Sequence, residues 1–178
     1  MDKIDIEKLN RENFRSMMNA LSRPGNIEDI KPLFKSNLLA VANTLLYAEV
    51  SYFYKGNEDF ELINAITNSK EFKEDEADYV FCDTLDERLF EVGKVGTMKD
   101  PEFSSTYIFK CKDFDGIEVK LSGPGINGSS NHTLPISKEF IEKFNNKNST
   151  FPMGNEVFFI NEKAQVLALS RTTKVEVL

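Results

Sequence analysis

Two positively charged side chains and three hydroxyl groups stand together near the end of the chain, in the segment Ser170-Arg-Thr-Thr-Lys174. A guanidinium group can hold a phosphate or a carboxylate with a fork of N–H donors, and threonine hydroxyls can add to that grip. The candidate anion-binding residues of this segment are Arg171, Thr172, Thr173 and Lys174. The structural alternative is that Arg171 pairs with an acidic residue and that the threonines are ordinary β-branched strand residues.

A second candidate is the glycine turn Leu121-Ser-Gly-Pro-Gly-Ile126, which follows a predicted strand. Gly123 and Gly125 flank a proline, and a tight turn of this kind exposes backbone N–H groups that can cradle an anion. The pattern is neither a phosphate-binding P-loop nor a dinucleotide fingerprint, and a plain strand-ending turn needs no ligand. A ligand site at this turn requires it to meet the 171–174 segment in space, because open α/β sheets bind ligands at strand ends.

Side chains suited to nucleophilic catalysis are scarce. His132 is the single histidine, and neither Ser129 nor Ser130 lies in a Gly-x-Ser-x-Gly elbow. Because successive side chains point apart, we expect no working Ser–His pair here. His132 is therefore predicted to be a surface-loop residue with a hydrogen-bond partner.

Metal and redox chemistry find little support in the sequence. One histidine cannot supply two imidazole ligands, and no Cys-x-x-Cys or His-Glu-x-x-His spacing occurs, so no metal site is expected. Cys82 and Cys111 lie in apolar, strand-like runs, which favours buried thiols over a disulfide. Asp83 and Asp86, like the acidic pair at positions 113 and 115, fall in predicted caps or turns. We therefore predict no catalytic residue and no cofactor.

The composition narrows the class of protein. The chain has 178 residues, a net charge of −7, and 15 phenylalanines with no tryptophan. An acidic chain disfavours nucleic acid as a partner, and rings without a polar atom belong in a core or in a protein interface. Charged residues follow Met1, and the longest mostly apolar stretch, 38–50, is too short to span a bilayer. We expect a cytoplasmic protein that does not associate with membranes.

Hydrophobic spacing and capping residues predict the elements that position these groups. The expected helices cover about 10–21, 36–48, 60–66, 85–90 and a segment after Ser137. The expected strands cover about 50–54, 77–82, 106–111, 117–122, 157–160, 166–169 and 175–178. The alternation of helices and strands predicts one α/β domain over residues 1–178, with a mixed sheet sandwiched by helices.

Three finer expectations concern packing. The apolar spacing of the first helix places its core face on Phe14, Met17, Met18 and Leu21. The Asp-Gly pair at 115–116 predicts a hairpin between strands 106–111 and 117–122. A polar turn at 161–163 predicts a second hairpin between strands 157–160 and 166–169.

Four motifs occur in order along the chain. They are Asn13-Phe-Arg-Ser-Met-Met-Asn-Ala-Leu-Ser-Arg-Pro-Gly25, Leu121-Ser-Gly-Pro-Gly-Ile126, Phe151-Pro-Met-Gly154 and Val166-Leu-Ala-Leu-Ser-Arg-Thr-Thr-Lys-Val175. Together they resemble the PhnH family, the H subunit of carbon–phosphorus lyase, and the triplet 171–173 is the most telling part. The chain departs from that pattern at Phe103-Ser104-Ser105 and at Asn155-Glu156, where the family shows an apolar residue followed by Asp.

The resemblance implies a fold like the large domain of pyridoxal-phosphate-dependent transferases, without the cofactor. It also implies a homodimer that works with the G, I and J subunits of carbon–phosphorus lyase, which couple a phosphonate to the ribose of ATP. No catalytic residue is established for this subunit. The alternative is a protein or enzyme that binds a nucleotide or phosphonate on its own, at the glycine turn and Arg171–Lys174. A divergent pyridoxal-phosphate enzyme is disfavoured, because no Schiff-base lysine is identifiable.

Overall fold

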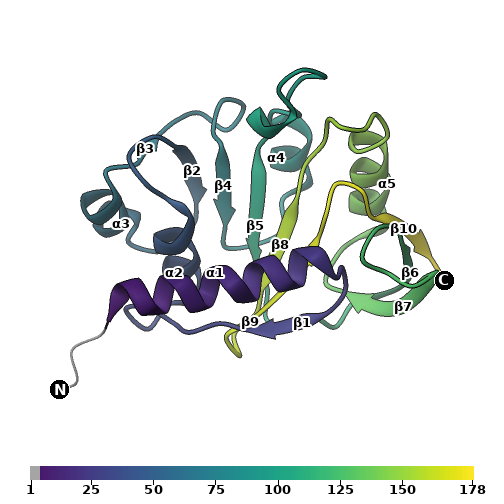
Figure 1. Ribbon diagram of the computed structural model, residues 1–178, viewed down its shortest axis with the longest axis horizontal. Coiled ribbons are helices and arrows are strands. Elements are labelled where there is room, and N and C mark those ends of the chain that lie inside the picture. Colours follow the sequence, from purple (N-terminus) through teal and green to yellow (C-terminus); the bar gives the residue numbers. More distant parts are fainter. Residues whose placement is uncertain (1–4) are drawn as a thin grey trace.

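The computed structural model describes residues 5–178 and has a seven-stranded mixed sheet at its centre (Figure 1). Its strands are β1 Ile27–Asp29, β2 Ser51–Lys55, β3 Lys70–Glu71, β4 Tyr79–Cys82, β5 Thr106–Lys110, β8 Val157–Ile160 and β9 Gln165–Leu169. The order across the sheet is β1-β9-β8-β5-β4-β2-β3. Strands β3, β2, β4, β5 and β8 run parallel, and β9 runs antiparallel to both of its neighbours. The mixed sheet and the hairpin between β8 and β9 were both predicted.

Helices cover both faces of this sheet. One face carries α1 Ile6–Ser22, α2 Asn37–Leu45 and α3 Phe60–Thr67. The other face carries α4 Glu87–Val92 and α5 Lys138–Lys147. A short 3-10 turn, Pro101–Phe103, lies between α4 and β5 in the sequence. Each α-helix begins after a side chain that accepts a hydrogen bond from its first turn, a common N-cap. The caps are Asp5, Ser36, Asp59, Asp86 and Ser137.

Two of these caps, Ser36 and Ser137, were predicted, and two other helix starts differ from the prediction. The first helix begins at Ile6, about one turn before the expected start at residue 10. The cap of α4 is Asp86, whose carboxylate accepts a hydrogen bond from Leu89 N at 3.0 Å. The helix therefore begins at Glu87, two residues later than the start of the expected range 85–90.

The hydrophobic core lies in two layers, one on each face of the large sheet. The layer under α1, α2 and α3 includes Met17, Leu38, Ile63, Phe81 and Ile108. The layer on the other face is rich in aromatic rings, among them Phe90, Tyr107, Phe109, Phe140, Phe144 and Phe159. Nine of the 15 phenylalanines are buried in one or the other of these layers, as their lack of a polar atom predicts.

A second sheet of three antiparallel strands was not predicted. It has the order β10-β6-β7 and consists of β6 Ile117–Ser122, β7 Ser129–Leu134 and β10 Lys174–Val177. The predicted hairpin across 115–116 is therefore wrong, since β5 pairs with β4 and β8, whereas β6 pairs with β7 and β10. The central residues of β5 are buried on both sides, while β6 buries alternate residues, and such strands belong to different kinds of sheet.

The predicted core face of α1 is also partly wrong. Its buried residues are Leu9, Asn13, Met17 and Ala20. Phe14 and Met18 are instead 49% and 38% exposed. Asn13 can be buried because its amide bonds twice to the backbone of Lys31, with its Nδ2 2.9 Å from the carbonyl oxygen and its Oδ1 2.8 Å from the N–H. No helix within residues 5–178 is both long enough and apolar enough to cross a membrane.

Candidate functional site

The glycine turn and the segment Arg171–Lys174 meet in space. A Cβ atom added to Gly123, whose φ is +132°, would lie 2.7 Å from the carbonyl oxygen of Thr172. A Cβ atom on Gly125, whose φ is +85°, would lie 2.0 Å from the carbonyl oxygen of Ser22 at the end of α1. Only glycine fits both positions. The turn is wedged between the end of α1 and the 171–174 segment, so its close contacts are with backbone.

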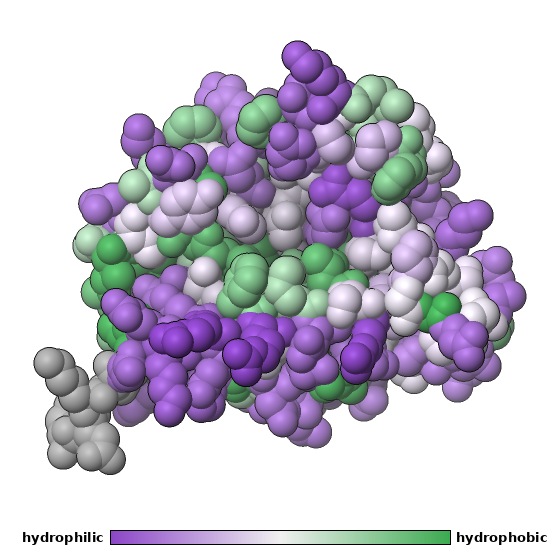
Figure 2. All heavy atoms as spheres, viewed as in Figure 1, coloured by the Kyte–Doolittle hydropathy of each residue, from purple (hydrophilic) through white to green (hydrophobic). Residues whose placement is uncertain are grey.

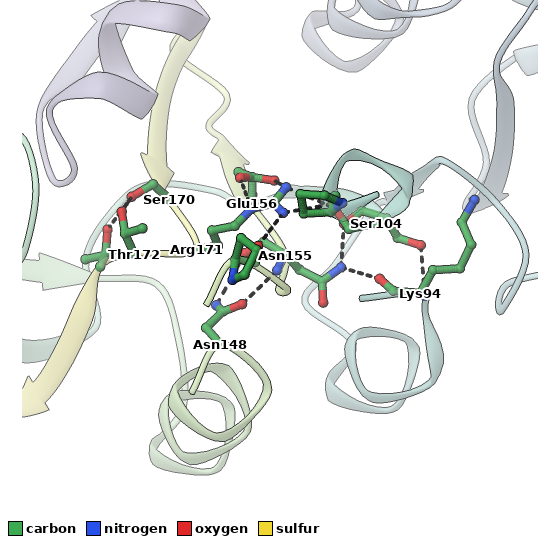
Figure 3. A network of polar contacts seen from close by, with 12 residues as sticks. Lys94, Ser104, Asn148, Asn155, Glu156, Ser170, Arg171 and Thr172 are labelled. Carbon is green, nitrogen blue, oxygen red and sulfur yellow. Dashed lines mark hydrogen bonds and ion pairs between the residues drawn. The ribbon is translucent and has the colours of Figure 1, made fainter. Parts of the chain in front are cut away.

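Arg171 uses every one of its N–H donors inside the protein (Figure 3). Nε and Nη2 form a bidentate pair with the carboxylate of Glu156, at 2.5 and 2.7 Å. Nη2 also donates to Ser104 Oγ at 3.0 Å, and Nη1 donates to the carbonyl oxygens of Pro101 and Pro152, at 2.9 and 3.1 Å. The structural alternative, an ion pair with an acidic residue, is confirmed, and Arg171 has no donor left for an outside anion.

A buried asparagine extends this polar network toward α5 (Figure 3). Asn155 is fully buried, and its Nδ2 donates to the carbonyl oxygens of Lys94 and Ser105, both at 2.6 Å. Its backbone N–H donates to Asn148 Oδ1 at 2.7 Å. The network therefore ties together the loop before β5, the loop before β8 and the loop after β9. These loops meet at the amino ends of the parallel strands, the opposite edge from the one where open α/β sheets bind ligands.

The remaining candidate anion-binding residues differ in their exposure and in their contacts with the rest of the protein. The Oγ atom of Ser170 lies 3.0 Å from Thr172 Oγ1 and 2.9 Å from Thr173 Oγ1, and Thr173 is only 3% exposed. Lys174 begins β10, is exposed, and forms no ion pair with any residue of 5–178. A cleft of about 500 Å³ is lined by Asn145, Asn148, Ser149, Phe151 and residues 171–176. It contains four of the six predicted anion-site residues, and the two glycines lie outside it.

The carboxyl edge of the parallel strands carries paired charges. Asp83 accepts hydrogen bonds from Tyr54 Oη at 3.0 Å and from Asn57 N at 2.9 Å, and Asp86 pairs with Lys55 at 2.7 Å. These contacts agree with the structural role predicted for both aspartates. A smaller cleft of about 250 Å³ lies beside them.

The two cysteines are free thiols, as predicted. Cys82 is buried and Cys111 is partly buried. Burial raises the pKa of each thiol to about 12, so both remain protonated and unreactive near neutral pH. Within residues 5–178, no three His, Cys, Asp or Glu side chains are grouped so that they could hold a metal ion.

His132 lies on strand β7, not in a loop, so its predicted location is wrong. Because alternate residues of a strand share a side, Ser130 can reach it, and Ser130 Oγ lies 2.8 Å from His132 Nε2. The ring packs on Gly25, where an added Cβ would lie 2.6 Å from Nε2. Burial lowers the pKa of His132. No carboxylate within residues 5–178 hydrogen-bonds to the ring, so the pair lacks the third member of a catalytic triad.

Lys147 has the most displaced pKa among the cations of the described chain. Burial lowers the pKa of its ammonium group to about 8. Nζ donates to the carbonyl oxygen of Phe90 and lies 3.3 Å from Tyr107 Oη and 4.8 Å from the centre of the Phe90 ring. Since Phe90 lies in the last turn of α4, Lys147 satisfies an end carbonyl of that helix, which is a structural role.

The four motifs noted in the sequence converge at one place. A Cβ atom on Gly154 would lie 3.2 Å from Arg171 Cβ, and Gly25 N lies 3.4 Å from the carbonyl oxygen of Ala168. A family model described as bacterial phosphonate metabolism protein (PhnH) matches residues 5–176. The chain belongs to the PhnH family. A curated relative from Stutzerimonas stutzeri, described as the putative C-P lyase subunit protein HtxG, is 25% identical over 169 residues, covering 91% of this chain and 83% of the relative.

In this PhnH family member, the motif residues mainly hold loops together. The sequence pointed to Arg171 but not to its partners Glu156 and Ser104, nor to Asn155. The available signal was that the chain departs from the family pattern at two places, one of which contains Ser104 and the other Asn155-Glu156. With 29 acidic residues in the chain, spacing alone could not select Glu156 as the partner.

Proposed function

We propose that this chain is a non-catalytic subunit of a carbon–phosphorus lyase complex in the breakdown of organic phosphonates. It forms a homodimer, and it assembles with the G, I and J subunits, which together transfer a phosphonate to the ribose of ATP. Membership of the PhnH family supports the pathway. The supporting observation in the structure concerns Arg171, the strongest candidate for ligand contact. All of its N–H donors are hydrogen-bonded within the protein.

The test is co-expression of the tagged chain with the G, I and J subunits, followed by affinity purification and light scattering. We expect a stable complex that contains all four chains, and a dimer when the tagged chain is purified alone. The chain alone, monomeric and free of the other subunits, would contradict the proposal. An unrelated acidic protein with the same tag controls for carry-over.

A second candidate function is binding of a small anion, a nucleotide or a phosphonate, at the cleft along residues 171–176. It rests on the cleft itself and on Lys174, an exposed cation at its wall. Thr172 adds a partly exposed hydroxyl group close by. A charged hydrogen bond of this kind contributes about 1.5–3 kcal/mol to binding.

Calorimetry with ATP and with methylphosphonate tests this candidate. Substituting Lys174→Met is expected to weaken binding about tenfold or more. The matched control Lys138→Met removes an exposed cation outside the cleft and should leave the affinity unchanged. Arg171 is unsuitable for this test, because its removal disturbs the fold. Absence of binding by the parent protein rejects the candidate.

A further inference from the structure

Helix α1 presents a basic stripe with apolar side chains beside it. Arg11, Phe14, Arg15 and Met18 are spaced i, i+3, i+4 and i+7, so they share one side of the helix, and Lys8 lies one turn before Arg11. All five side chains are exposed. Two members of this α1 stripe, Phe14 and Met18, belong to the face that the apolar spacing had assigned to the core, and they point outward because Asn13 and its neighbours take the inner side.

The cations of the α1 stripe are unpaired. No carboxylate in the described part of the chain lies within 4 Å of Lys8, Arg11 or Arg15. Glu12 is already paired with Lys31, and that contact lowers the pKa of its carboxyl group. Near the stripe, Glu7 lies in the first turn, where its carboxylate interacts favourably with the helix dipole. A chain with a net charge of −7 therefore carries a local excess of positive charge.

An apolar area adjoins the stripe. Figure 2 shows the side of the molecule crossed by α1, with a purple band of hydrophilic side chains along the helix and a green apolar area directly above it. Phe14 and Met18, 49% and 38% exposed, are the large apolar residues that the outer side of α1 contributes. Aromatic, methionine and arginine side chains together are the composition typical of the centre of a protein interface.

We propose that the α1 stripe is the surface by which this chain docks onto a different protein chain, one that offers carboxylates around an apolar pocket. This inference rests on the proposed function, since it names the surface used in that assembly. The carboxylates of the partner pair with Arg11 and Arg15, and the pocket takes the ring of Phe14. The opposite charges also steer the two proteins together.

Charge and helix packing favour a different protein chain over a second copy of this chain and over a membrane. A second copy docked through the same stripe would bring Arg11 and Arg15 of both copies together, and like charges at an interface are unfavourable. A membrane-binding helix buries its apolar face in lipid, whereas the main apolar face of α1, with Leu9, Met17 and Ala20, is packed into the core.

The test compares three variants in the four-chain co-expression. Arg11→Glu with Arg15→Glu reverses the charge of the stripe, and Phe14→Ala with Met18→Ala removes its apolar part. The matched control, Ile66→Ala with Lys70→Ala, removes one exposed apolar side chain and one exposed cation from α3 and β3. We expect all three to keep a melting temperature close to that of the parent, because the residues are exposed and unpaired.

Both stripe variants are expected to bind the partner subunits about tenfold more weakly or worse, while the control binds like the parent. Binding of the parent should weaken as the salt concentration rises. If the parent assembles and the stripe variants assemble equally well, the docking surface is elsewhere and only this inference fails. If the parent does not assemble, the proposed function fails with it.

Two further measurements test the alternative occupants, a second copy of this chain and a membrane. Light scattering of each variant without partners shows whether the stripe joins two copies, and a dimer that becomes monomeric would overturn the proposal. Sedimentation with vesicles containing phosphatidylglycerol shows whether the stripe binds a membrane. Lipid binding that depends on Arg11 and Arg15, with unchanged assembly, would overturn it as well.

Discussion

Substituting Arg171→Met is expected to lower the free energy of unfolding by about 3–5 kcal/mol. The side chains of Arg171 and Glu156 are only 16% and 17% exposed, so the substitution leaves a carboxylate inside the protein without its partner. It also removes the donors that Ser104 and the carbonyl oxygens of Pro101 and Pro152 share. For a chain of this size, the melting temperature should fall by roughly 10 °C, measured by circular dichroism.

Two controls distinguish the effect of breaking the buried ion pair on stability from the effect of removing any charged side chain. Lys120→Met breaks the exposed ion pair with Glu176, whose side chains are 40% and 58% exposed, and should change stability by less than about 1 kcal/mol. The double substitution Arg171→Met with Glu156→Leu should recover part of the loss, because no unpaired charge remains. An Arg171→Met protein as stable as the Lys120→Met protein would show that the network contributes little.

The second large effect is expected for Phe140→Ala, with a loss of about 3–5 kcal/mol. Phe140 is fully buried on α5, and its ring lies 4.9 Å from Phe90, 6.1 Å from Phe109 and 6.2 Å from both Phe144 and Phe159. Truncation leaves a cavity that these rings, held on two strands and two helices, cannot close completely. Urea unfolding followed by circular dichroism measures the loss.

The matched control is Phe103→Ala, since Phe103 is 62% exposed and lies outside both core layers. Its effect should stay within about 0.5 kcal/mol. Phe140→Leu keeps much of the volume and should fall between the two. Equal losses for Phe140→Ala and Phe103→Ala would mean that the aromatic layer is not packed as the structure shows.

The local features of this protein were determined by its sequence. Ser36 and Ser137 begin helices as predicted, because a cap acts on N–H groups only two or three residues away. The hairpin of β8 and β9 was predicted from two apolar runs and the short turn between them. The four family motifs also identified the family before any contact was known. Each of these signals is contained in residues that are close in the sequence or in a fixed order.

Only the tertiary structure decided which distant segments meet. β6 pairs with β10 rather than with β5, Arg171 pairs with Glu156 among 29 acidic residues, and Asn13 turns the helix so that Phe14 faces solvent. Such choices depend on whether a buried polar group finds a partner and whether a strand is covered on one face or on two. Residue spacing does not specify either condition, because both depend on atoms of residues that are distant in the sequence.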